Sequence, residues 1–124
     1  MEPIFGYLKL AEKLVLNGDK YSESWNFGPT EDNFRKVSYV IRSLNKLAKC
    51  SFFKTVNIKQ PHESKILKID SSKARSRLNW KNYLDLETAL NKTFEWYDFW
   101  LNKKNMYNIS IDQINFFQKK IKSK

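Results

Sequence analysis

The sequence is poor in the residues on which many catalytic sites depend. Its 124 residues include one cysteine, one histidine and three glycines. A lone Cys50 excludes an internal disulfide and a zinc site built mainly from cysteine. The glycines stand apart at positions 6, 18 and 28, so neither a Gly-rich dinucleotide loop nor a P-loop is present in the sequence. Carboxylates do not surround His62 at metal-ligand spacing, so we expect no metal site.

Longer motifs of several enzyme and membrane classes are also missing. The sequence has no Gly-x-Ser-x-Gly elbow, and no tyrosine is followed four residues later by lysine, a pair that marks many redox enzymes. No run of about 20 apolar residues could span a membrane. The N-terminus, MEPIFGYLKLAEKL, carries charges throughout and does not resemble a signal peptide. We therefore expect a cytoplasmic chain without complete catalytic machinery of its own.

The composition is that of a folded, basic domain. Hydrophobic residues make up 41% of the chain and aromatic residues 15%, enough for one compact core. The net charge of +10 would attract polyanions such as nucleic acid, anionic lipid or sugar nucleotides. However, 19 of the 23 cations are lysine and the chain has 12 asparagines, a pattern typical of compositional bias on solvated surfaces. Nucleic-acid binding is therefore an alternative rather than the first interpretation.

Hydrophobic periodicity predicts helices along most of the chain. The expected helices cover residues 3–17, 35–48, 72–78 and 83–103, with a terminal helix after them. Asp85 is the expected N-cap of the long helix, and Asp70 or Ser71 that of the short one. Ser110 and Gln113 have the spacing of a capping box, which would start the terminal helix there.

Short β-rich runs alternate with these helices. They lie at residues 25–27, 51–59 and 65–70. The order predicts an α/β fold, α+β-like as an isolated fragment, that is rich in helix and has a small sheet. We expect a main domain over residues 1–102 and a terminal helical extension over residues 103–124 that packs on it.

A few residues could bind a ligand. His62 follows Pro61 and precedes Glu63, and on such a loop it could contact a ribose, base or phosphate, or simply lie at the surface. Asn26 precedes the Gly28-Pro29 turn, where an amide more often satisfies the turn backbone than a ligand. The helical pair Lys73 and Arg77 could hold phosphate or form a solvated face. Aromatic residues between 94 and 100 are expected in the core, because acids rather than cations lie between them.

Four stretches, taken in order, resemble the C-terminal third of CDP-glucose 4,6-dehydratases, a branch of the extended short-chain dehydrogenase/reductase group. They are EPIFGYLKLAEKL, WNFGPTEDN, QPHESKILKIDSSKARSRLNW and LDLETALNKTFEWYDFW. The run from Asp70 to Trp80 is shared by many sugar-nucleotide epimerases and dehydratases, whereas EPIFGYL and Pro-His-Glu are more specific to this branch. Asn79 stands where that run usually has glycine.

The resemblance implies a division of labour between two parts of an enzyme. In such enzymes an N-terminal Rossmann domain binds NAD and carries the Tyr-x-x-x-Lys pair, while the C-terminal part closes over the nucleotide sugar. The implied reaction converts CDP-glucose to CDP-4-keto-6-deoxyglucose and water. By position, His62 and Glu63 would lie near the nucleotide, and Asn26 and Glu2 are weaker substrate-binding candidates.

The resemblance also leaves three functional hypotheses. This chain would be a substrate-binding fragment without its Rossmann half, unable to bind NAD or to turn over substrate alone. It would instead be a complementing subunit if that half were separately encoded. A small basic nucleic-acid-binding protein is the alternative from a different class. In a chain without its Rossmann half, the apolar side chains that would pack on that half, around Ile4, Phe5 and Leu8, would be exposed and favour self-association.

Overall fold

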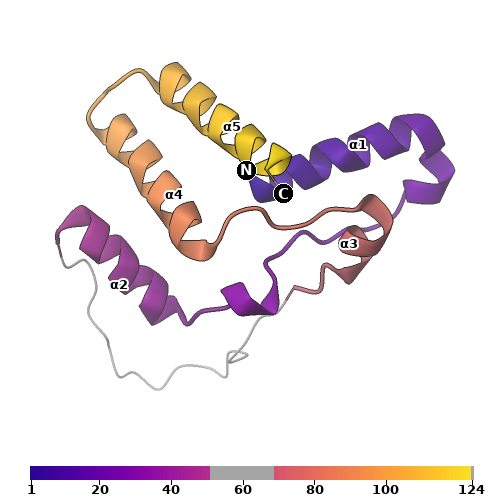
Figure 1. Ribbon diagram of the computed structural model, residues 1–124, viewed down its shortest axis with the longest axis horizontal. Helices are drawn as coiled ribbons and strands as arrows, with labels where there is room; N and C mark the ends of the chain where they lie inside the picture. The colour runs from indigo at the N-terminus through magenta and orange to yellow at the C-terminus, as the bar shows by residue number, and fades with distance from the viewer. Residues whose placement is uncertain (51–68, 124) are drawn as a thin grey trace.

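A computed structural model describes residues 1–50 and 69–123 of the chain (Figure 1). This part contains five α-helices and one 3₁₀ helix. Their bounds are α1 Glu2–Tyr21, η1 Glu31–Asn33, α2 Val37–Ala48, α3 Ser72–Leu78, α4 Leu86–Leu101 and α5 Met106–Lys122. The predicted short helix at 72–78 is confirmed, and the predicted helices at 35–48 and 83–103 are confirmed with ends shifted by a few residues.

The helices form two groups that are joined through α5. Helix α3 packs against α1 in one group, and α2 lies beside α4 in the other. Helices α4 and α5 form an antiparallel hairpin, and α5 runs back toward the start of α1 (Figure 1). Three rings close this link, with centroids of Phe5, Tyr83 and Phe117 5.8–5.9 Å apart in edge-on contacts.

The core of the first group is built around an indole ring. Trp80 is 1% exposed and packs with Ala74 and Leu78 of α3. The Phe27 ring meets Trp80 edge-on at 5.3 Å and also lies directly over Gly6 of α1. A Cβ atom at position 6 would overlap that ring, so glycine is required for α1 to approach the segment this closely.

The predicted small sheet, and with it the α/β class, is wrong for the described residues, which are helical and contain no strand. Residues 25–27 are extended, but the backbone N–H of Gly28 donates to Ser71 Oγ at 2.7 Å rather than to a neighbouring strand. A strand exists only when another pairs with it, and this segment packs on helices α1 and α3 instead. The run at 51–59 and most of the run at 65–70 lie outside the described residues.

Helix ends follow their capping side chains. The predicted N-cap Asp85 is confirmed, because its Oδ1 accepts a bond from the Thr88 N–H at 2.7 Å, and this bond lowers the pKa of the Asp85 carboxyl. The predicted start of the last helix at Ser110 is wrong. Asn105 caps α5 instead, accepting from two backbone N–H groups, while Ser110 Oγ accepts from the Trp96 indole at 3.2 Å. The division into domains 1–102 and 103–124 stays a prediction.

Asn79 ends α3 in the left-handed conformation, with φ 48° and ψ 40°, and the Trp80 N–H returns to the Ala74 carbonyl at 3.2 Å. Asparagine and glycine tolerate this backbone, whereas other residues pay a steric cost of about 1–2 kcal/mol.

We expect Asn79→Ala to lower the free energy of unfolding by about 1 kcal/mol and Asn79→Gly to leave it nearly unchanged. Urea denaturation followed by circular dichroism measures both, and equal loss in the two variants would contradict the assignment.

An apolar stripe along α1 faces outward. Ile4 is 53% exposed, Leu8 64% and Val15 87%, while the neighbouring Phe5 is turned into the ring cluster. Exposed apolar stripes of this kind promote association.

We expect concentration-dependent self-association of the chain, reduced by the double variant Leu8→Gln/Val15→Gln. Analytical ultracentrifugation tests this, with Val37→Gln on α2, 73% exposed, as the matched control; a monomeric wild type would refute it.

Candidate functional site

A groove lies between α2 and α4. Its volume is about 730 Å³. Arg42, Lys46 and Lys49 line it from α2 and its C-cap, and Glu87, Leu90 and Asn91 line it from α4, together with Tyr39, Ser43 and Leu47. The Tyr39 hydroxyl donates to Glu87 Oε1 at 2.9 Å and ties the two helices together. We call this hollow the α2–α4 groove.

The α2–α4 groove is electropositive. Arg42 and Lys46 are one helical turn apart, so both side chains lie on the same face of α2. Three cations against the single carboxylate of Glu87 leave a formal excess of two positive charges. Lys46 and Lys49 also complement the negative end of the α2 dipole, but Arg42 extends the charge beyond the last turn. Hydroxyl and amide groups from Ser43 and Asn91 add neutral hydrogen-bonding partners for a ligand.

The two cations of α3 that could have held phosphate form ion pairs with another residue of the chain instead. Lys73 Nζ donates to Glu23 Oε2 at 2.9 Å, and Arg77 pairs with the other oxygen of the same carboxylate. The hydrogen bond from Lys73 lowers the pKa of Glu23. Both cations also lie over the Trp25 ring, at 5.1 and 5.2 Å from its centroid. These residues fasten α3 to the segment that follows α1, which explains their spacing without a ligand.

Glu2 has a defined role at the start of α1. Its Oε1 accepts hydrogen bonds from the backbone N–H groups of Tyr83 and Leu84, both at 2.7 Å. Its carbonyl oxygen accepts from the Trp80 indole at 3.2 Å. One residue therefore fixes the first turn of α1 to the whole segment between α3 and α4.

A smaller cavity adjoins this clamp. It has a volume of about 220 Å³ and is lined by Glu2, Asn33 and Asn82 together with apolar groups such as Phe27 and Leu84. Glu2 Oε2 and Asn82 Oδ1 are buried there and have no hydrogen-bond partner among the residues that the structure describes. The substrate contact predicted for Glu2 stays a prediction.

The other predicted site residues do not gather around these two hollows. Asn26 is exposed in the segment after α1, and it is absent from the described lining residues of either hollow. His62 and Glu63 lie outside the described residues. Sequence reasoning missed Arg42 and Lys46, although their i, i+4 spacing was visible, because only the fold shows that α4 forms the opposite wall.

Two further searches concern metals and membranes. Within residues 1–50 and 69–123, His, Cys, Asp and Glu side chains do not gather in groups of three that could hold a metal ion. None of the helices described is both long and apolar enough to cross a bilayer.

The Glu2 clamp predicts a specific loss of stability. A hydrogen bond to a charged group contributes roughly 1.5–3 kcal/mol, and Glu2→Ala would leave two backbone donors unpaired. We expect this variant to lower the free energy of unfolding by about 2 kcal/mol, and Glu2→Gln, which keeps one carbonyl oxygen, to lose less. Urea unfolding at neutral pH measures the difference. Glu12→Ala, at an exposed position on α1, is the matched control and should be neutral.

Comparison with known proteins supplies the remaining information about the chain. No family model matches it. It is similar to a CDP-glucose 4,6-dehydratase of Salmonella typhimurium, with 30% identity over 116 residues. The match covers 93% of this chain and 32% of that protein, so the chain spans about a third of its relative's length. The likeness supports the resemblance at family level only: the chain is distantly similar to part of a protein of that name.

Proposed function

We propose that this chain is the nucleotide-sugar-binding part of a CDP-glucose 4,6-dehydratase-like protein. The observation that carries the proposal is the identity of 30% over 93% of the chain to a protein of that name. The family-level relationship makes a nucleotide sugar the first ligand to test. The same argument makes catalysis a property of the whole dehydratase-like protein, so we expect the chain alone to bind CDP-glucose without converting it.

The α2–α4 groove is the place in the described residues where such a ligand fits by charge. A nucleotide sugar carries a diphosphate between two hydroxylated groups. Arg42, Lys46 and Lys49 supply cationic donors for the diphosphate, and guanidinium groups bind phosphate oxygens in a bidentate manner. Ser43, Tyr39 and Asn91 supply polar groups for hydroxyls. The volume of about 730 Å³ lies in the usual range for ligand sites.

The described residues do not fit NAD, the cofactor implied by the family. A dinucleotide site needs a strand, a Gly-rich turn and the start of a helix, in that order. Gly6 and Gly18 lie inside α1, and Gly28 lies in an extended segment whose N–H is bound to Ser71. NAD would therefore bind to other parts of a dehydratase-like protein, and no step of the reaction is assigned to residues of this chain.

Binding of CDP-glucose by the groove can be measured directly. We expect isothermal titration calorimetry at low ionic strength to show binding, and the double variant Arg42→Glu/Lys46→Glu to weaken it about tenfold or more. Each lost charge-assisted hydrogen bond costs roughly 1.5–3 kcal/mol. Lys119→Glu/Lys122→Glu, which makes the same charge change in the last turn of α5, should retain affinity.

Four results would contradict the proposal or its placement. Absence of CDP-glucose binding by the wild-type chain would refute the function. If the groove variant and the control variant weakened CDP-glucose binding equally, the loss would be a general effect of charge, and the placement in the groove would be refuted. Tight, steeply salt-dependent binding of an oligonucleotide with no response to CDP-glucose would favour the nucleic-acid alternative. Turnover of CDP-glucose by the chain alone would overturn the division between binding and catalysis.

A further inference from the structure

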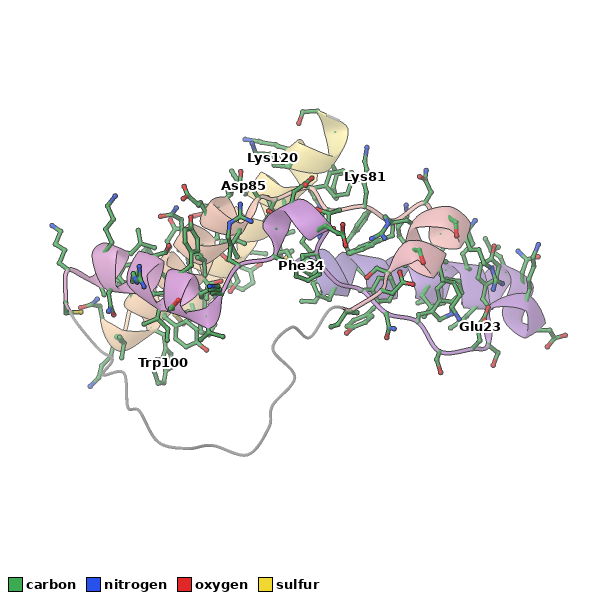
Figure 2. The ribbon with its side chains drawn as sticks, turned by 90° about the horizontal axis from the view of Figure 1, so that it is seen from below. Glu23, Phe34, Lys81, Asp85, Trp100 and Lys120 are labelled. Carbon is green, nitrogen blue, oxygen red and sulfur yellow. The ribbon has the colours of Figure 1, made fainter. Side chains whose placement is uncertain are left out.

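Two aromatic side chains at the end of α4 are exposed, contrary to the core position expected for them. Tyr97 is 54% exposed and Trp100 56%, and their ring centroids are 6.5 Å apart at 86°. In Figure 2, Trp100 projects at the outer edge of the half of the molecule that contains α2. The neighbouring Trp96 is instead turned toward α5, where its indole binds Ser110. We call Tyr97 and Trp100 the aromatic platform.

The aromatic platform continues the line of the α2–α4 groove. Leu90 lines the groove, and Tyr97 follows seven residues later, which returns it to the same face of the helix. A rise of 1.5 Å per residue puts the two positions about 10 Å apart along α4. Figure 1 shows α2 and α4 side by side, running in the same direction. Tyr97 and Trp100, at the far end of α4, are both more than half exposed.

The charge around the aromatic platform does not oppose an anionic ligand. Asp98 is the acid next to both rings, and its carboxylate is held by Lys104 at 3.8 Å and by the Asn102 amide at 3.0 Å. Lys103 and Lys104 follow directly in the turn after α4. The cations of this turn lie at the end of α4 that carries the platform, and those of the α2–α4 groove lie on α2 and its C-cap.

We propose that the aromatic platform stacks the base of a nucleoside diphosphate whose phosphates lie in the α2–α4 groove. This inference rests on the proposed function and adds the part of the ligand that the groove does not explain. Every nucleobase has an aromatic face, and aromatic side chains beside a cationic groove are the usual arrangement for binding one. The separation of about 10 Å along α4 suits a ligand that joins a flat base to a diphosphate through a ribose.

Tryptophan fluorescence tests the stacking in the full chain. Trp100 is the exposed indole, whereas Trp80 is 1% exposed and Trp25 is covered by two cations. We expect CDP to quench the emission and pyrophosphate, which has no base, to bind without quenching. Trp100→Phe should remove the quenching, and Trp96→Phe, one helical turn away, should retain it. Tyr97→Ala should weaken CDP about fivefold or more, the effect of losing one base–aromatic stack, and leave pyrophosphate affinity unchanged.

The outcomes separate this inference from the proposed function. If CDP binds through Arg42 and Lys46 but quenching persists in Trp100→Phe and affinity persists in Tyr97→Ala, the platform is refuted and the groove stands. If neither CDP nor pyrophosphate binds, both are refuted. If oligodeoxythymidine quenches Trp100 and CDP does not, the platform serves a strand rather than a nucleotide. If Tyr97→Ala only changes the sedimentation coefficient, the surface joins two copies of the chain, and the inference is again overturned.

Discussion

The burial of Trp80 is the constraint on which the rest of the described structure depends. Its ring lies between α1, α3 and the segment that carries Phe27, and its indole N–H donates to the carbonyl of Glu2. A buried indole N–H usually has a hydrogen-bond acceptor, because leaving it unpaired costs free energy. The acceptor is the first turn of α1, and the Glu2 side chain then holds the backbone at Tyr83 and Leu84. The start of α4 follows directly, so the position of one indole sets the entry of the helix that forms the groove.

The two groups of helices differ in how completely they bury their apolar surface. Around Trp80 the packing is close enough that α1 requires glycine at position 6. By contrast, α2 and α4 are tied by Tyr39 and Glu87 and have an open groove between them. A groove lined by cations is stable because its charged groups remain in contact with water, whereas the same groups in a closed core would need partners. The groove therefore lies where the packing is less complete.

Much of the local structure could be read from the sequence, and the pairing of surfaces could not. Asp85 caps α4 as predicted because a cap depends on residues within one turn. Ser110 does not cap a helix, because α5 already begins five residues earlier, where the Asn105 side chain accepts the capping hydrogen bonds. The Ser110 hydroxyl instead accepts from the Trp96 indole. Lys73 and Arg77 look like a free basic face in the sequence, but both pair with the carboxylate of Glu23, about 50 residues earlier. For the α2–α4 groove, the sequence shows the spacing of Arg42 and Lys46 on α2. It does not show that α4 forms the opposite wall.

The sequence by itself determined where the helices lie and what chemistry is scarce, because periodicity, caps and composition act over a few residues. It also carried the resemblance to a nucleotide-sugar dehydratase, which the comparison supports at family level. Only the tertiary structure decided that residues 25–27 pack as an extended segment rather than a strand, since pairing needs a second strand in space. It likewise decided that Arg42 and Asn91 line one groove and that Tyr97 and Trp100 are exposed, because burial depends on which helices pack together.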